Sequence, residues 1–271
     1  MLRIDGVTAP PYSTGPVQPS DALLLAGGGL VAGVVNTLAG GGSLLTVPLL
    51  VMLGVPGPVA NGTNRVGVVL GSAVATWRLT ALGVSGARDA LPLVVPSALG
   101  ALLGAYGVVQ LPAEVFNRVF GLLMLVLLVP TLRGARAPAS PARGTPASPA
   151  RVKGVPAPLR FLVFLAVGLY GGAFQAGVGI LLISLLSLAG VDLVRSTHIK
   201  TALNTCFTLL ALPIFWWAGQ ILWAEALALG TGFVAGGALG ARAAVRGGER
   251  IIKPVLAVAV VVLAGRMLGL Y

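Results

Sequence analysis

The stretch Gly33-Val34-Val35-Asn36-Thr37-Leu38-Ala39-Gly40-Gly41-Gly42-Ser43-Leu44-Leu45-Thr46-Val47-Pro48 decides how this chain folds. It lies inside the run 22–53, which contains no Asp, Glu, Lys or Arg. As one straight helix this run would extend about 48 Å, well beyond the ~30 Å hydrocarbon core of a bilayer. Three consecutive glycines disfavour an unbroken helix, because each costs about 1 kcal/mol. We therefore predict a helix over 22–38, a break at the glycines, and a short helix over 43–53.

The glycine break has two interpretations that the sequence leaves open. Ser43 is expected to cap the short helix, which places free backbone N–H groups at its N-terminus. A helix that begins inside a membrane after a flexible turn is suited to bind an anion. Alternatively, the glycines only let two helices pack closely.

Composition places the chain among membrane proteins. Hydrophobic residues make up 56% of it and charged residues only 9%, whereas soluble domains average about 25% charged residues. We therefore predict an all-α polytopic membrane protein. The net charge of +11 is not a nucleic-acid signature, because the basic residues cluster in loops between apolar spans, as in the positive-inside pattern. One Cys and one His exclude a disulfide framework and argue against a metal site, and no cofactor is expected.

The chain divides into two transmembrane units joined by a basic segment. We expect residues 1–20 to be a disordered lead rather than a cleaved signal peptide. The segment 133–158 is rich in Ala, Pro and Arg and has no acid, which predicts a flexible cytoplasmic linker. The transmembrane units are 21–132 and 159–271. The first is expected to hold three further spans over 60–82, 90–109 and 114–132.

The second unit repeats landmarks of the first at a nearly constant offset. Gly40-Gly41-Gly42 corresponds to Gly177-Val178-Gly179, 137 positions on, and Arg65 corresponds to Lys200 at an offset of 135. The remaining matches are Gly54-Val55 with Gly190-Val191, Gly100 and Gly104 with Gly236 and Gly240, and Glu114 and Arg118 with Glu249 and Lys253. This order predicts an internal duplication into two homologous halves.

The basic residues favour an inverted arrangement of these halves. With four crossings per half, the basic cluster Arg242, Arg246, Arg250 and Lys253 would lie opposite the 133–158 linker. Counting the short helix after each glycine break as a fifth crossing places both on the cytoplasmic side. An odd number of crossings makes the halves inverted repeats, an architecture common in secondary transporters. Each half then has four main transmembrane helices and one short re-entrant or half helix.

The glycine-broken stretch, the Ala60-Asn61-Gly62-Thr63-Asn64 that follows it, and a weaker echo over 170–184 resemble the TauE/SafE sulfite exporter family. The resemblance covers essentially the whole apolar chain. It implies a multi-pass protein of the cytoplasmic membrane that moves sulfite or a small organosulfonate. Which anion is moved, and in which direction, varies within the family.

The residues themselves also point to a small oxyanion. Such a site needs fixed N–H dipoles, hydroxyl donors and one or two cations. Arg65 and Lys200 are expected to face a central cavity together with two helix N-termini, because a cation inside a span usually faces a bundle interior. The predicted substrate-binding residues are Gly41, Gly42, Ser43, Thr46, Asn61, Thr63, Asn64 and Arg65 in the first half, and Gln175, Gly177, Gly179, His198, Lys200, Thr201 and Asn204 in the second, with Ser184 as a further hydroxyl.

Each of these residues has a simpler interpretation. Arg65 and Lys200 can snorkel to the lipid headgroups, and Ser and Thr routinely bond to their own helix backbone. His198 either carries a proton or lies at the membrane interface. Two further groups are predicted to have structural roles. Phe215-Trp216-Trp217 and Trp223 are expected to form an aromatic belt, and Gly232, Gly236 and Gly240 to form a helix-packing face.

The leading hypothesis is a secondary transporter of a small sulfur-containing anion. The sequence has no Walker-type motif for ATP hydrolysis, and it lacks the nucleophile–base pair or metal cluster of an enzyme. A transporter of another small anion, such as a carboxylate, and an anion channel remain alternatives. The expected partners are the substrate, the lipid bilayer and, as one option, a second copy of the chain; no nucleic acid is expected.

Overall fold

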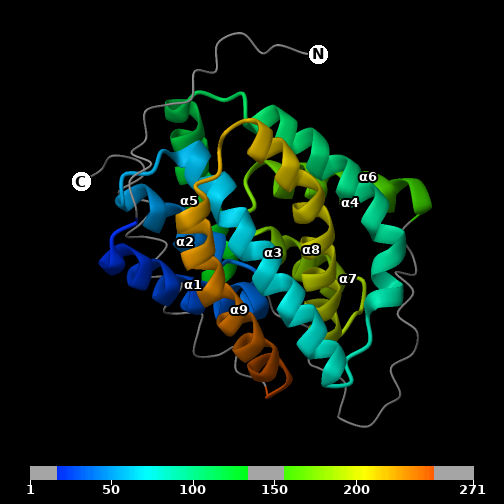
Figure 1. The fold of residues 1–271 in the computed structure, drawn as a ribbon. Coiled ribbons are helices and arrows are strands. Elements are labelled where there is room, and N and C mark those ends of the chain that lie inside the picture. Colours follow the sequence, from blue (N-terminus) through cyan, green and yellow to red (C-terminus); the bar gives the residue numbers. More distant parts are fainter. Residues whose placement is uncertain (1–16, 134–155, 247–271) are drawn as a thin grey trace.

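The computed structural model describes residues 17–133 and 156–246, and within these residues the chain is entirely helical (Figure 1). The predicted all-α class is thereby confirmed. The predicted lead 1–20, the linker 133–158 and the end of the second unit lie largely outside the described residues. The helices are α1 (Pro19–Ala39), α2 (Ser43–Met52), α3 (Gly57–Ala81), α4 (Ala87–Val108), α5 (Ala113–Arg133), α6 (Ala157–Ala173), α7 (Val178–Leu188), α8 (Leu193–Trp217) and α9 (Trp223–Arg246).

Four helices in the described part of the chain are long and apolar enough to cross a membrane, namely α1, α4, α8 and α9. Helix α3 is as long as α8, at 25 residues, but it is more polar. Its first half is buried without interruption from Gly57 to Val68, so it faces protein rather than lipid. Polar side chains on α3 are therefore shielded by neighbouring helices, which is where a membrane protein tolerates them.

Helix α1 ends at the glycines. Gly40 adopts a left-handed conformation with φ of 81°, and its N–H bonds to the carbonyls of Val35 and Asn36, the closure that glycine favours. Helix α2 then begins at Ser43, preceded by Gly42, and no side chain caps it. The prediction that Ser43 is the N-cap is therefore wrong. The second unit has a similar interruption, in which Gly177 (φ 67°) precedes α7.

The predicted span over 60–82 begins earlier in the structure. Helix α3 starts at Gly57 because Pro58 occupies its first turn, where a missing N–H costs nothing. The turn after α2 therefore ends at Pro56.

Helices α1 and α9 pack through small residues. A Cβ on Gly232 would collide with the carbonyl of Ala26, and one on Gly236 with the carbonyl of Leu30. The residue numbers of the contacting positions increase together along both helices, so α1 and α9 run in the same direction. The backbones approach this closely only where side chains are absent. A Cβ on Gly240 would also crowd Thr37 of α1, so the predicted packing role of Gly232, Gly236 and Gly240 is confirmed.

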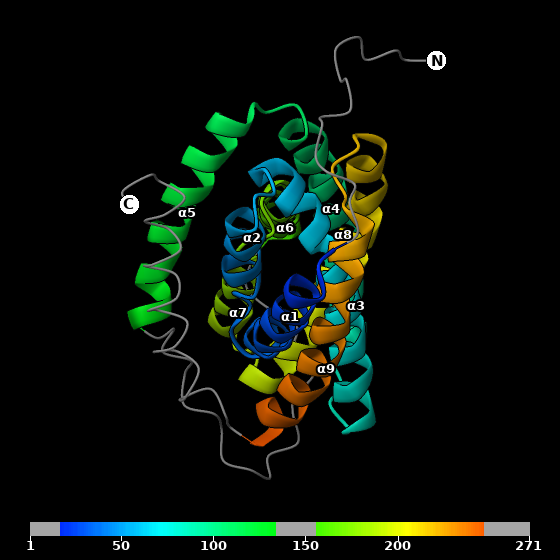
Figure 2. The same cartoon turned by 60° about the vertical axis from the view of Figure 1, so that its left-hand side comes forward.

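Helices α4 and α6 form a second pair of the same kind. Gly100 lies against the carbonyl of Leu165, and Gly104 lies against that of Leu169. These helices therefore also run in the same direction. In Figure 1 the α1–α9 pair and the α4–α6 pair lie on either side of α3 and α8, and Figure 2 shows α5 at the edge of the bundle.

Helices α3 and α8 cross at the centre of the bundle in opposite directions. Thr80 near the end of α3 bonds to His198 near the start of α8, with 3.1 Å between Oγ1 and Nε2. At the other end the backbone N–H of Leu222, just after α8, donates to Thr63 Oγ1 near the start of α3 (3.0 Å). The 82–86 loop and the 218–222 loop therefore lie at opposite ends.

The two ends of the bundle differ in charge. We call the end where α3 stops and α4, α6 and α8 begin the basic end. The charged side chains that the structure describes there are those of Arg78, Arg88, Asp89, Arg160, Asp192, Arg195, Arg242 and Arg246. The opposite end carries Asp21, Glu114, Arg118 and Glu225.

Exposed tryptophans lie near both ends. Trp77 lies near the basic end, and Trp216, Trp217 and Trp223 lie near the other. Phe215 is fully buried, so its predicted place in the aromatic belt is wrong.

Candidate functional site

The two glycine interruptions meet inside the bundle. A Cβ added to Gly40 would overlap the backbone of Gly179, and a Cβ on Gly179 would overlap Gly40 Cα. Only glycine at both positions permits this approach. Segments 139 positions apart in the sequence therefore touch, and the polar side chains around them form the candidate site.

Arg65 caps the C-terminus of α6 by donating hydrogen bonds to its last carbonyls. Its side chain is fully buried, and its two terminal nitrogens donate to the carbonyls of residues 171–173 at 2.5–3.3 Å and to Gln175 Oε1 at 3.1 Å. The Phe215 ring covers the guanidinium, with 4.1 Å between Cζ and the ring centroid. A cation here stabilises the last carbonyls of the helix and its negative dipole end. The third nitrogen of Arg65, Nε, is buried and has no hydrogen-bond partner among the described residues.

Lys200 does the same for α1. Its Nζ donates to the carbonyls of Asn36 (2.6 Å) and Thr37 (2.7 Å) in the last turn of α1, and its side chain is fully buried. Arg65 and Lys200 therefore both lie inside the protein, covered by neighbouring helices. The sequence analysis expected them beside helix N-termini, whereas their described hydrogen bonds go to helix C-termini.

A small polar cluster surrounds the start of α2. Asn64 Nδ2 donates to Ser43 Oγ at 2.9 Å, and Thr46 Oγ1 donates to Asn64 Oδ1 at 2.5 Å. All three residues are buried. Nearby, Asn61 Nδ2 donates to the carbonyl of Ala173 at 2.8 Å, alongside Arg65. The structure thus brings together the polar residues that the sequence analysis selected from 43–65, apart from Thr63.

A chain of hydrogen bonds connects the ends of α1 and α6. Gln175 Nε2 donates to Asn204 Oδ1 (2.7 Å), and Asn204 Nδ2 donates to Ser72 Oγ (3.0 Å). Ser72 also accepts from Asn36 Nδ2 at 3.3 Å, and Thr208 Oγ1 donates to Gln175 Oε1 at 3.2 Å. We call these five residues, together with Arg65, the central layer.

The sequence analysis missed three members of the central layer. Asn36 lies within the quoted glycine-broken stretch. Ser72 and Thr208 lie 136 positions apart, close to the offset predicted to relate the two units. The presence of a polar residue at both of two matching positions was therefore the signal that could have identified Ser72 and Thr208.

The central layer retains donors that its described hydrogen bonds do not use. Each amide nitrogen can donate two hydrogen bonds, and the amide oxygens of Gln175 and Asn204 already accept bonds. Among the described residues no Asp or Glu is buried. A positively charged guanidinium surrounded by spare N–H and O–H donors is suited to hold an anion.

The remaining predicted residues take other positions. Thr63 bonds to the 218–222 loop, and Thr201 Oγ1 bonds to the carbonyl of His198 one turn earlier in its own helix. His198 itself lies toward the basic end. Gly41, Gly42 and Gly177 lie in the interruptions before α2 and α7.

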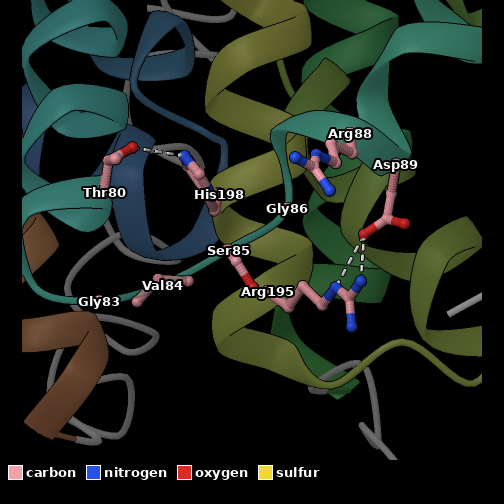
Figure 3. Close-up of a pocket in the computed structure, with 9 residues that line it drawn as sticks. All are labelled: Thr80, Gly83, Val84, Ser85, Gly86, Arg88, Asp89, Arg195 and His198. Carbon is pink, nitrogen blue, oxygen red and sulfur yellow. Dashed lines mark hydrogen bonds and ion pairs between the residues drawn. The ribbon is translucent and has the colours of Figure 1, made fainter. Parts of the chain in front are cut away.

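A cavity of about 460 Å³ opens at the basic end, around the loop between α3 and α4. Arg195 on α8 forms an ion pair there with Asp89 on α4, with 2.8 Å between Nε and Oδ2 (Figure 3). The sequence analysis did not predict this cavity, because its residues come from three separate helices. It is lined by the loop 83–86 with Thr80, Arg88, Asp89, Arg195 and His198. In the described ranges, no three His, Cys, Asp or Glu side chains are grouped to hold a metal ion.

An all-helical bundle with bilayer-length apolar helices around a buried polar layer defines a polytopic membrane protein. The family model for the sulfite exporter TauE/SafE matches residues 25–267, and the chain belongs to this family. Curated relatives agree. A "Probable membrane transporter protein ORF9" from Sinorhizobium is 30% identical over 242 residues, covering 88% of this chain and 89% of the relative.

Two further relatives have similar names. A "Probable membrane transporter protein" of Haemophilus influenzae is 26% identical, covering 88% of this chain and 91% of its own length. The "Probable membrane transporter protein YfcA" of Escherichia coli K12 is 26% identical, covering 88% of this chain and 86% of its own length. No solved structure gives a significant match. The chain is therefore a membrane transporter, and the prediction that it is not an enzyme is confirmed.

Proposed function

We propose that this chain is a secondary transporter of a small sulfur-containing anion, sulfite or an organosulfonate, across the cytoplasmic membrane, and that it binds the anion in the central layer. The observation that carries this proposal is the buried, unpartnered Nε of Arg65. A buried donor left without a partner costs about 1–3 kcal/mol, and more on a charged group. An anion accepting from this nitrogen recovers that free energy.

The anchoring of Arg65 makes it a suitable donor. Its terminal nitrogens are held by α6 carbonyls and Gln175, so the guanidinium is positioned before the anion arrives. Positioned donors bind an oxyanion without further loss of side-chain entropy. The spare amide hydrogens of Asn204 and Gln175 supply neutral donors nearby. A trigonal or tetrahedral oxyanion has enough oxygens to accept from several such groups at once.

We further propose that the two units are inverted repeats. Exchanging the halves turns the α1–α9 pair into the α6–α4 pair. Within each pair the two helices run in the same direction. It also exchanges Arg65 of α3, which bonds to the end of α6, with Lys200 of α8, which bonds to the end of α1. Related helix pairs that rock around a shared site are the usual basis of alternating access. Because positively charged loops remain inside, we assign the basic end to the cytoplasm.

A transport assay tests this function. Purified protein in liposomes is given sulfite, sulfoacetate, thiosulfate and acetate, and uptake is followed with radiolabel or an internal sensor. We expect saturable uptake of a sulfur oxyanion that acetate does not inhibit. Preferred uptake of acetate contradicts the substrate class, and ohmic conductance without saturation contradicts a transporter and supports a channel.

A further inference from the structure

His198, which lines the cavity at the basic end, has a buried ring nitrogen with no partner. His198 is 1% exposed, and its Nδ1 makes no hydrogen bond within the described residues. The Thr80 hydroxyl donates to the carbonyl of Thr76 (3.0 Å), so it accepts from His198 Nε2. Nδ1 is then an acceptor in the neutral ring and a donor in the imidazolium. The hydroxyl of a protonated oxyanion can donate to Nδ1 of the neutral ring. A fully ionised oxyanion can accept from Nδ1–H of the imidazolium.

The charges around the cavity favour an anion. Asp89 is paired with Arg195 across the space between α4 and α8. Arg88, on the first turn of α4, also lines the cavity and is exposed, and Figure 3 shows it beside this pair. The ion pair leaves the positive charge of Arg88 as the excess charge of the cavity lining. Clefts with one excess charge concentrate small ions of the opposite sign.

A line of polar side chains connects this cavity with the central layer. On α3, Ser72, Thr76 and Thr80 follow each other at four-residue intervals, which places them on one face. On α8, His198 and Asn204 lie opposite the two ends of this line. The contacts are Thr80 with His198 at the cavity (3.1 Å) and Ser72 with Asn204 in the central layer (3.0 Å). We call this face between α3 and α8 the polar seam.

Helix α8 contributes further hydroxyls on the same side. Thr201 is buried and lies one turn from His198, and Thr205 follows one turn later. Both hydroxyls bond to carbonyls of their own helix, and each oxygen retains a lone pair for water or another donor. The seam therefore has polar groups on both walls.

The opposite half of the same helix pair has no such seam. At the offset of 136 that relates Ser72 to Thr208, the positions matching Thr76 and Thr80 are Leu212 and Trp216, and neither has a hydroxyl. Phe215 covers Arg65, which separates the central layer from the 218–222 loop with an apolar ring. The line of hydroxyls at Ser72, Thr76 and Thr80 therefore has no counterpart in the other half of α8. This asymmetry gives the seam a direction, from the central layer to the basic end.

We propose that the cavity is an entry site for a small oxyanion, with Arg88 and His198 as its binding groups, and that the anion reaches the central layer along the polar seam. This inference rests on the proposed function for the role of the central layer. The ligand class is a sulfonate or sulfite-like anion small enough for a cavity of about 460 Å³.

Cysteine labelling tests the entry site. In a Cys206→Ala background, Thr76→Cys is compared in liposomes with Ala211→Cys, a buried control position in the other half of α8. The reagents are sulfonatoethyl methanethiosulfonate and its trimethylammonioethyl counterpart, each rate normalised to that with free mercaptoethanol. Reagent is added to the side from which Ser85→Cys in the 82–86 loop reacts. We expect Thr76→Cys to prefer the anionic reagent by about fivefold or more, the effect of one nearby charge, and Ala211→Cys to stay unlabelled.

Two further measurements identify the binding groups. Adding Arg88→Gln should reduce the preference for the anionic reagent about fivefold, and millimolar methanesulfonate should slow labelling of Thr76→Cys. Equal normalised rates for the two reagents, labelling only from the other side, or no protection by methanesulfonate would overturn the proposal. If Thr76→Cys does not fold, Thr201→Cys on the facing wall carries the same expectations. Labelling does not require transport, so these results stand even if the liposome panel finds a different transported anion.

Discussion

Replacing Arg65 by lysine separates two roles that we assign to this side chain. The terminal nitrogens close α6, and Nε has no partner and is available to an anion. A lysine can perform the first role, because Lys200 closes α1 with bonds of 2.6 and 2.7 Å. It cannot perform the second as well, because an ammonium lacks the rigid multi-donor fork of a guanidinium. Arg65→Lys should therefore weaken binding more than it weakens the fold.

The magnitudes follow from the bonds lost. Arg65 makes four described hydrogen bonds, and a lysine that keeps two of them loses about 2 kcal/mol of stability at about 1 kcal/mol each. At 2–4 °C per kcal/mol, the Tm should fall by about 4–8 °C. Losing one charge-assisted bond to the substrate costs about 1.5–3 kcal/mol, which raises the half-saturation concentration about 10- to 150-fold.

The assay combines thermal unfolding in detergent with a concentration series of sulfite uptake. Arg65→Gln should lower the Tm by more than Arg65→Lys, because it also removes the charge at the end of α6. Arg118→Gln, an exposed arginine on α5, is the matched control and should change neither quantity. A lowered Tm with unchanged half-saturation in Arg65→Lys would refute the proposed contact and leave Arg65 with a structural role only.

Three further predictions concern other parts of the molecule. Gly179→Ala should abolish uptake and lower the Tm, because its Cβ would overlap the facing glycine, whereas Gly107→Ala, with open space around it, should be tolerated; equal effects would contradict the close approach. Ser72→Ala removes the acceptor of two amides and should reduce uptake about 5- to 100-fold; unchanged uptake would remove it from the site. Impermeant reagents should label Ser85→Cys and Ala218→Cys from opposite sides, and labelling from one side would contradict the assigned topology.

The helices were largely predictable because glycine, proline and hydropathy act locally. The sequence predicted helices over 22–38 and 43–53, and the structure has them at Pro19–Ala39 and Ser43–Met52. Gly40 alone sets the end of α1, since a positive φ there costs glycine nothing. Helix α3 is different, because its burial comes from neighbours that are distant in sequence, and hydropathy cannot show them.

The candidate site was predictable as a set of residues but not as a geometry. Arg65, Lys200, Gln175 and Asn204 were selected because polar groups inside an apolar chain need partners. Which partners they find depends on how α1 meets α8 and how α6 meets α3, and no local pattern encodes that. The cavity at the basic end illustrates the same limit. Its ion pair joins Asp89 to Arg195, 106 positions apart.

The C-terminal contacts of the two cations do not conflict with an anion site. Each interruption places a helix C-terminus beside a helix N-terminus, carrying about −0.5 and +0.5 elementary charge respectively. An anion between them gains from the starts of α2 and α7 only if the ends of α1 and α6 do not repel it. Lys200 and Arg65 lie on those two ends and neutralise them. If the anion binds as proposed, the two cations raise its affinity through the helix dipoles without contacting it. Lys200→Gln should therefore weaken uptake of every anion by a similar factor.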